Sequence, residues 1–267
     1  MRPMDRYFWD SPTTRGVATL TGHEAHHLIH VMRGRLGTRV VLFDGSGCEF
    51  QAVVEGVGHG EVQLSIVDRQ EVDRELPVHL TLAVALPKGD RQRWLVEKAV
   101  ELGVERLVPL GTLRSVAQPV VQALARLQRN VIEASKQCGR NRLMQIAQPQ
   151  NWPDLVATTG HIPTRILAHP ESQTGATEAR GSAQPLPAAR PADPVLLAVG
   201  PEGGFSTEEV ALAVAAGWRA VDLGPRILRV ETAALVLAAI VAQHTAVGIP
   251  SDLTRGHNRA SHHNKED

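Results

Sequence analysis

The chain has 267 residues, of which 43% are hydrophobic and 21% are charged, and its formal net charge is +0 at pH 7. This composition is that of an ordinary globular protein, and the length suits two domains of unequal size. The neutral balance argues against a protein that is basic over its whole surface, although it leaves room for a local basic face.

The cysteines and the apolar runs indicate the compartment. Only two cysteines occur, Cys48 and Cys138, without a C-x-x-C pair, so a disulfide framework and a zinc ribbon are both disfavoured. The N-terminal stretch lacks the apolar core of a signal peptide, and the longest apolar run, Ala233 to Ala242, is too short to cross a bilayer. We therefore expect a cytoplasmic protein that is not inserted in a membrane.

The N-terminal part of the chain predicts a small β-barrel. Between Val40 and Val67, short runs of Val, Leu, Phe and Ile alternate with Asp-Gly-Ser-Gly and Gly-His-Gly turns. Such spacing is typical of short strands joined by tight hairpins. The charged stretch 68–75, followed by Pro77, predicts a domain boundary, which gives a first domain over residues 1–75.

The rest of the chain predicts an α/β domain over residues 76–249. A strand at 79–86 precedes an amphipathic helix from about Arg91 to Leu102, a stop at Gly103 and a second strand at 105–110. The alternation continues with a helix around 123–137, strands at 164–168 and 195–199, and two loop-helix units. This order is typical of a parallel sheet with helices on both faces.

Two segments show neither the hairpin pattern of the first domain nor the α/β alternation of the second. Residues 171–194 are rich in Ala, Pro, Ser and Gly and predict a mobile loop, whereas residues 250–267 form a polar, His-rich tail that we expect to be disordered. Neither composition supplies enough apolar residues for a packed core.

A formal match to the H-E-x-x-H zinc signature occurs at His23-Glu24-Ala25-His26-His27. In a zinc peptidase the two histidines lie one turn apart on a long helix, and a third ligand completes the site. Glycines follow soon after this stretch, and no pattern for a third ligand is present. We therefore predict no metal site, but a helix that is capped by Thr21 and covers the barrel with Leu28, Ile29, Val31 and Met32.

The segment from Leu86 to Arg142 carries a basic face, because it holds eleven Lys and Arg against five Asp and Glu, a net charge of +6. Within it a helix ends at Gly139, and the turn that follows presents donors from Arg140, Asn141 and Arg142. Such donors suit RNA phosphates and the edges of unpaired bases. The alternative is a solvated helix end whose arginines complement the helix dipole, and the residues alone favour neither reading.

Two similar stretches near the C-terminus each run from an apolar segment through a Gly-Pro loop into a helix, LAVGPEGGFSTEEV and VDLGPRILRVETAAL. Neither has the ending of a P-loop or the spacing of a dinucleotide fold. Ser206 stands three residues before Glu209, a spacing that predicts a capping box at the start of the first of the two helices. Gly203 and Gly204 have no Cβ, so a flat ligand such as an adenine ring can approach the main chain closely. The helix after the second loop is apolar on every side, which predicts burial by the fold and by a second subunit.

The chain resembles the RsmE family of SPOUT-class methyltransferases through the stretches KGDRQRWLVEKAVELGV, EASKQCGRNR, LAHP, GPEGGFS and LGPRILRVETA. The stretch HHLIHVMRGRLGTRVVLFDGSG resembles the PUA-like barrel of that family. The resemblance implies a trefoil knot in the C-terminal region and an obligate homodimer. It further implies S-adenosylmethionine-dependent methylation of N3 of a uridine in 16S ribosomal RNA of the small subunit. The insertion after LAHP looks longer than is usual in the family.

Residue by residue, the resemblance implies that three loops, brought side by side by the knot, hold the cofactor. These loops contain Ala168, His169 and Pro170, then Gly200, Pro201, Glu202, Gly203 and Gly204, and finally Leu223, Gly224, Leu228 and Arg229. Contacts with RNA are expected from Arg33, Lys88, Arg114, Arg140, Asn141 and Arg142.

Methylation of N3 requires loss of an imide proton and stabilisation of the negative charge that remains. Arg229 or Arg226 could stabilise this charge by charge-assisted hydrogen bonds. Glu231 is a candidate base, and a role in anchoring the backbone is an equal alternative. A SPOUT enzyme acting on a ribose 2′-hydroxyl, a noncatalytic RNA-binding protein and, least favoured, a zinc peptidase stay open. The sequence does not decide between naked RNA and the assembled small subunit as substrate.

Overall fold

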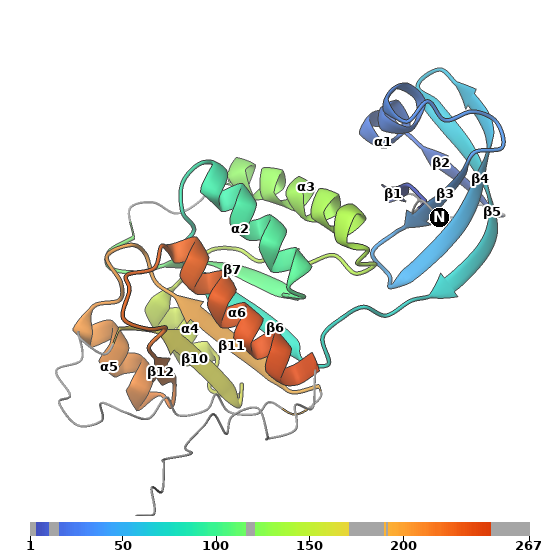
Figure 1. The fold of residues 1–267 in the computed structure, drawn as a ribbon. Coiled ribbons are helices and arrows are strands. Elements are labelled where there is room, and N and C mark those ends of the chain that lie inside the picture. The colour runs from blue at the N-terminus through green and yellow to red at the C-terminus, as the bar shows by residue number, and fades with distance from the viewer. Residues whose placement is uncertain (1–3, 11–15, 116–120, 171–189, 191, 247–267) are drawn as a thin grey trace, which may run out of the picture.

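In the computed structural model, residues 4–10, 16–115, 121–170, 190 and 192–246 are described, and they form two sheets at opposite ends of an elongated molecule (Figure 1). The predicted tail and most of the predicted insertion at 171–194 lie outside these residues. Within the described part of the chain, no helix is both long and apolar enough to cross a membrane.

The N-terminal sheet has the strand order β1-β3-β4-β5-β2 and confirms the predicted hairpins. Strand β1 runs parallel to β3, and the other neighbours are antiparallel. At the turn between β4 and β5, His59 has a φ of 53° and Gly60 a φ of 80°, the left-handed pair that a two-residue hairpin needs. The strands are β1 Arg6–Phe8, β2 Val17–Leu20, β3 Arg39–Phe43, β4 Cys48–Gly58 and β5 Glu61–Glu71.

The predicted helical segment is present and consists of two short parts. Helix α1 (Gly22–His26) continues as a π-helix, η1 (His27–Val31), and Leu28 is buried as predicted. The prediction was wrong for Val31 and Met32, which are 57% and 42% exposed, and the Thr21 side chain makes no capping bond. The i→i+5 bonding of the π-helix turns the following side chains around the axis, away from the sheet.

The second sheet has the strand order β12-β10-β11-β6-β7-β8, and every pair along this path is parallel, as predicted. The short strand β9 also pairs in parallel with β7. Apolar, β-branched runs fill the central strands, which suits burial on both faces. The strands are β6 His79–Val84, β7 Arg106–Gly111, β8 Gln145–Ile146, β9 Gln150–Asn151, β10 Thr164–Ala168, β11 Pro194–Val199 and β12 Arg219–Val221.

Helices cover both faces of the parallel sheet, and each face has its own core (Figure 1). Side chains alternate along β11, so that Leu197 packs with one core and Leu196 with the other. The first core lies under α2 (Asp90–Glu101), α3 (Val121–Cys138) and α6 (Val230–Ala246). The second core lies under α4 (Trp152–Thr158) and α5 (Thr207–Ala215).

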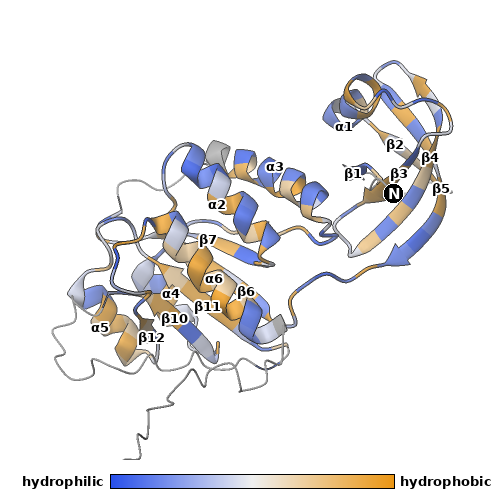
Figure 2. Cartoon of the chain, viewed as in Figure 1, coloured by the Kyte–Doolittle hydropathy of each residue, from blue (hydrophilic) through white to orange (hydrophobic). Residues whose placement is uncertain are grey.

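Helix α6 is apolar but is not buried on every side by this chain. Leu237 and Ala238 are fully buried against the sheet, whereas Val236 is 37% exposed. Figure 2 shows apolar residues along α6 on a side that no other described element covers. The predicted trefoil knot stays a prediction, since the segment that joins β10 to β11 is largely outside the described residues.

Candidate functional site

The carboxyl ends of β6, β7, β10, β11 and β12 lie along one edge of the parallel sheet. Open α/β sheets bind ligands at this edge, because the loops that leave the strands there converge. The three predicted cofactor loops follow β10, β11 and β12, and β10 lies between the other two strands. The sheet order therefore brings the three loops together, which the sequence alone could not establish.

The loop after β10 presents a buried histidine. His169 is 5% exposed, its main-chain N–H donates to the carbonyl of Val221 over 2.9 Å, and its Nδ1 has no hydrogen-bond partner in the described part of the chain. Burial lowers the pKa of His169 and Arg114 lowers it further, while Asp222 opposes both effects. His169 is therefore a neutral side chain at neutral pH, with one ring nitrogen left for a ligand.

The main chain of the loop after β11 lies close to the side chain of Arg114. Gly204 has a φ of 66°, and a Cβ on Gly203 would lie 3.3 Å from Cδ of Arg114. The predicted capping box is confirmed: the Ser206 side chain accepts from the N–H of Glu209, and Glu209 accepts from the N–H of Ser206. The Glu209 carboxylate also accepts from the N–H of Leu113 over 2.8 Å, which ties this loop to the one after β7.

The loop after β12 is open to solvent at its tip. Gly224 has a φ of 107°, and its N–H donates to Asp222 over 2.8 Å, so the chain turns sharply there. Arg226 and Arg229 are exposed, and between them Ile227 is 99% exposed. Leu223 and Leu228, which were also predicted for the cofactor loop, pack partly buried against the first core.

Arg91, which was not predicted as a site residue, lies between two acidic groups of this edge. Its Nη1 donates to Oε1 of Glu202 over 3.3 Å and lies 3.7 Å from Oε2 of Glu231. Glu231 is 5% exposed, and no hydrogen bond to its Oε2 exists within the described residues. Arg91 thus joins the start of α2 to the β11 loop and to the first turn of α6. Its position in the first turn of α2, the helix that follows β6, is the signal that could have identified it.

The prediction that Arg140 and Asn141 contact RNA was wrong, because both side chains are used inside the protein. Arg140 is 4% exposed, pairs with Glu75, and donates to the carbonyls of Val100 and Val104 over 3.0 and 2.9 Å. Asn141 is 2% exposed and is bonded to the N-terminal sheet. Helix α3 does end at Gly139, but its end is buried at the junction of the two sheets.

This junction is a polar network. Glu49 accepts from Arg6 and from Arg74 over 2.5 Å each, and Arg6 also donates to Asn141 over 2.6 Å. Burial favours the neutral form of Glu49, but the hydrogen bonds from Arg74 and Arg6 together prevail, so its pKa lies below the usual value. Two arginines that share one carboxylate fix the orientation of the N-terminal sheet against the end of α3.

The four other predicted RNA contacts are exposed and lie in separate segments. Arg33 is exposed after the π-helix, and Arg142 is exposed beside Gly47, whose Cβ would lie 3.1 Å from the Arg142 guanidinium. Lys88 is exposed just after β6. Arg114 is exposed too, but its Nη1 donates to the carbonyl of Gly203 over 2.5 Å, so it supports the β11 loop.

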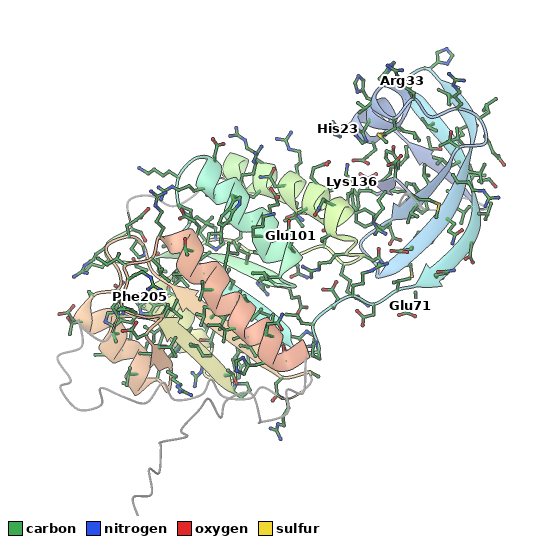
Figure 3. All side chains as sticks on the ribbon, in the orientation of Figure 1. His23, Arg33, Glu71, Glu101, Lys136 and Phe205 are labelled. Atoms are coloured by element: carbon green, nitrogen blue, oxygen red, sulfur yellow. The ribbon has the colours of Figure 1, made fainter. Side chains whose placement is uncertain are left out.

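The zinc-like stretch forms a contact between domains. His23, Glu24 and Glu133 bring ligand atoms within 4.8 Å of one another. However, Nζ of Lys136 lies 2.8 Å from both carboxylates, in the position that a metal ion would need. Figure 3 shows Lys136 at the end of α3 that faces the N-terminal domain. Glu24 therefore holds α1 against α3, and it is not free to activate a metal-bound water.

Comparison with known proteins identifies the class. Residues 74–242 match the RNA methyltransferase domain family, and residues 20–67 match the RNA methyltransferase PUA domain. The chain belongs to this family of RNA methyltransferases. Within it, the chain is a member of the ribosomal RNA small subunit methyltransferase E (RsmE) family, as the resemblance implied.

Two relatives carry that family name. The protein from Synechocystis is 35% identical over 83% of this chain and 71% of its own length, and that from Bacillus subtilis is 29% identical over 85% and 90%. Among solved structures, a Legionella pneumophila methyltransferase with bound S-adenosylmethionine (SAM) has 30% identity and a TM-score of 0.79. The ribosomal RNA small subunit methyltransferase E from Neisseria gonorrhoeae, also bound to SAM, has 28% identity and a TM-score of 0.78. Each alignment covers 90% of this chain and 98% of the other.

The new position of Arg140 makes a testable contrast with Arg142. Arg140→Met leaves Glu75 without its partner in a buried site and should lower the free energy of unfolding by about 3 kcal/mol. Arg142→Met removes an exposed cation, so we expect a stability change within about 0.5 kcal/mol together with weaker RNA binding and a flatter salt dependence. Urea unfolding and filter binding at several salt concentrations measure both. Equal losses of stability in the two variants would contradict the assignment.

Proposed function

We propose that this protein transfers a methyl group from SAM to N3 of a uridine in 16S ribosomal RNA of the small subunit. The observation that carries the proposal is the convergence of three loops, two of them with left-handed glycines, at the carboxyl edge of a parallel sheet. The names of the relatives and the SAM bound in two similar structures support the reaction type and the substrate class.

The residues present fit SAM. The orphaned Nδ1 of His169 and the main chain around Gly203, where a Cβ would meet Arg114, form a cradle of polar and side-chain-free surface. Ala168, Pro170, Gly200 and Pro201 complete the proposed cradle, and the loop after β12 closes it with Gly224 and Arg229. A neutral His169 adds no positive charge beside a sulfonium group. When bound, SAM supplies an electrophilic methyl group.

Side chains of this protein must stabilise the negative charge that develops on the base. Loss of the N3 proton leaves negative charge on the two neighbouring carbonyl oxygens, and exposed guanidinium groups can stabilise it. Arg226 and Arg229 are candidates, since neither forms an ion pair with another described residue. For Glu231, burial next to Arg91 supports the anchoring role over direct proton abstraction.

The proposed function assigns a separate role to each domain. On this proposal, residues 1–75 form the RNA-binding PUA-like domain, residues 76–249 form the knotted catalytic domain, and Arg33 and Arg142 extend the RNA contacts beyond the active site. Ribosomal RNA as substrate implies a cytoplasmic location.

A homodimer would cover the apolar face of α6. Val236 lies at the middle of this face, and an exposed apolar helix face is a typical protein interface. We therefore expect the intact chain to sediment as a dimer, and Val236→Asp to sediment as a folded monomer, because a buried carboxylate would face its own copy. Val57→Asp, which makes the same change at an exposed valine of the N-terminal sheet, is the control that should stay dimeric. A wild-type monomer at micromolar concentration would overturn this assembly.

Nucleoside analysis tests the reaction itself. We expect mass spectrometry to find 3-methyluridine in small-subunit RNA after incubation with this protein and SAM, and to find none without the protein. A ribose 2′-O-methylated nucleoside would favour the rival SPOUT activity, and unchanged nucleosides on bound RNA would indicate a noncatalytic RNA-binding protein.

Gly204 tests the cofactor loop. Gly204→Val places a branched side chain at a φ of 66° in the cradle, so we expect SAM affinity measured by calorimetry to fall at least about tenfold. Gly60→Val imposes similar strain at a φ of 80° in a distant hairpin and should leave the affinity unchanged. Normal SAM binding by folded Gly204→Val would rule out the cofactor assignment of this loop.

Arg229 tests the charge stabilisation. Arg229→Ala should lower the single-turnover rate of methyl transfer about a hundredfold at saturating RNA and SAM, because a donor to the developing charge is lost. Arg126→Ala, an exposed arginine of α3, should keep the wild-type rate. RNA and SAM affinities of Arg229→Ala should stay near normal. A wild-type rate for this variant would move the role to Arg226 or to the main chain.

A further inference from the structure

A cavity of about 250 Å³ opens at the same edge of the sheet, beside the proposed cofactor loops. It lies between the segments that follow β6, β7 and β11, and it shares Pro201 and Glu202 with the β11 loop. Since β11 stands between β6 and β10, the β11 loop separates this cavity from the loops after β10 and β12. A group in the cavity and a cofactor in the loops would therefore be neighbours.

The size and the walls of the cavity suit one flat ring. Drug-sized ligands occupy roughly 300–1,000 Å³, so this cavity suits a smaller group. Its apolar walls come from Ala85, Leu86, Pro87 and Pro201, and the polar groups in it are Lys88, Arg91, Ser115 and Glu202. Apolar faces with a few polar groups at one side are the usual setting for a nucleobase that has left its stack.

The charged groups of the cavity include both hydrogen-bond donors and a hydrogen-bond acceptor. Arg91 and Lys88 offer only donors, and the Glu202 carboxylate offers only acceptors. Arg91 Nη1 is held between Glu202 Oε1 at 3.3 Å and Glu231 Oε2 at 3.7 Å, which leaves its other N–H groups for a ligand. Lys88 forms no ion pair with any other described residue. The Ser115 hydroxyl already accepts from the N–H of Thr112 over 2.9 Å.

We propose that this cavity selects the target base as uracil, with Lys88 and Arg91 donating to O2 and O4 and Glu202 accepting from N3–H. The Watson–Crick edge of uracil offers two acceptors and one donor, which two cationic side chains and one carboxylate can complement. The proposal rests on the proposed function, and it assigns base selection to residues that lie outside the loops after β10 and β12.

Other bases fit this set less well. Cytosine would turn its unprotonated N3 toward the Glu202 carboxylate and its amino group toward a cation, so two of three contacts would be repulsive. Guanine could offer two donors to Glu202, but it would leave Lys88 without an acceptor and needs space for a second ring. The contact with N3–H must also be released before N3 reacts. If the proton passes to Glu202, the electron pair stays on the base, and the neutral carboxyl group loses its attraction to Arg91.

Nucleotide binding tests the proposal without any chemical step. Uridine, cytidine and guanosine 5′-monophosphates are titrated, up to about 10 mM, into the intact protein with S-adenosylhomocysteine, and ligand-observed NMR gives each affinity. We expect uridine monophosphate to bind at least about tenfold more tightly than cytidine monophosphate. Glu202→Gln should bring the two affinities to within about twofold, because an amide can donate to N3 of cytosine as well as accept.

Two further variants distinguish a specific role of Lys88 in base binding from the effect of removing any positive charge nearby. Lys88→Met should weaken uridine monophosphate binding several-fold, whereas Arg93→Met, on the same helix as Arg91 but outside the cavity, should not. Thermal unfolding and S-adenosylhomocysteine affinity confirm that each variant is folded. Equal affinities for uridine and cytidine monophosphates in the wild type, a preference that survives in Glu202→Gln, tighter binding of guanosine monophosphate, or no binding of any nucleotide would each overturn the proposal. If 3-methyluridine still forms in small-subunit RNA, only the pocket assignment fails. If it does not, the proposed function fails as well.

Discussion

The parallel pairing of β10 with both β11 and β12 is the constraint on which the candidate site depends. A parallel neighbour aligns carboxyl ends, so three loops that are far apart in the sequence open at one edge and share one space. The β11 loop lies at the centre of this arrangement. One side of the loop faces the loops after β10 and β12, and the other side lines the cavity. Glu202 lines the cavity, and the adjacent Gly203 packs against Arg114 of the loop after β7.

Arg91 connects the parts of the site that the backbone alone leaves separate. It belongs to α2, it contacts Glu202 of the β11 loop, and it lies near the buried Glu231 of α6. A buried carboxylate without a cation nearby costs folding free energy, so Arg91 compensates for the burial of Glu231. In turn, Glu231 holds the Arg91 side chain in place. The contacts with Glu202 and Glu231 hold the guanidinium group of Arg91 at the mouth of the cavity.

Sequence patterns predicted the parallel sheet, the hairpins and the capping box of α5, because each depends on local periodicity or on turn chemistry. They did not predict the segment 145–158, where two-residue strands and a short helix carry too few residues for a periodic signal. The roles of Arg140 and Asn141 were wrong for another reason. A helix end rich in donors looks alike whether RNA or Glu75 accepts from it, and only tertiary contacts decide. The loop residues were found through family resemblance, whereas the contact of Arg91 with Glu202 becomes visible only once β6 is placed beside β11.

The network of Arg6, Glu49, Arg74 and Asn141 ties the N-terminal sheet to the end of α3. In the proposed function, an RNA that contacts both the N-terminal sheet and the active-site edge must present its two contact regions at the spacing that this junction sets. A folded RNA element already holds such a spacing, whereas a flexible strand must be ordered first, at an entropic cost. On that proposal, the junction would favour structured RNA over a flexible single strand with the same target nucleotide.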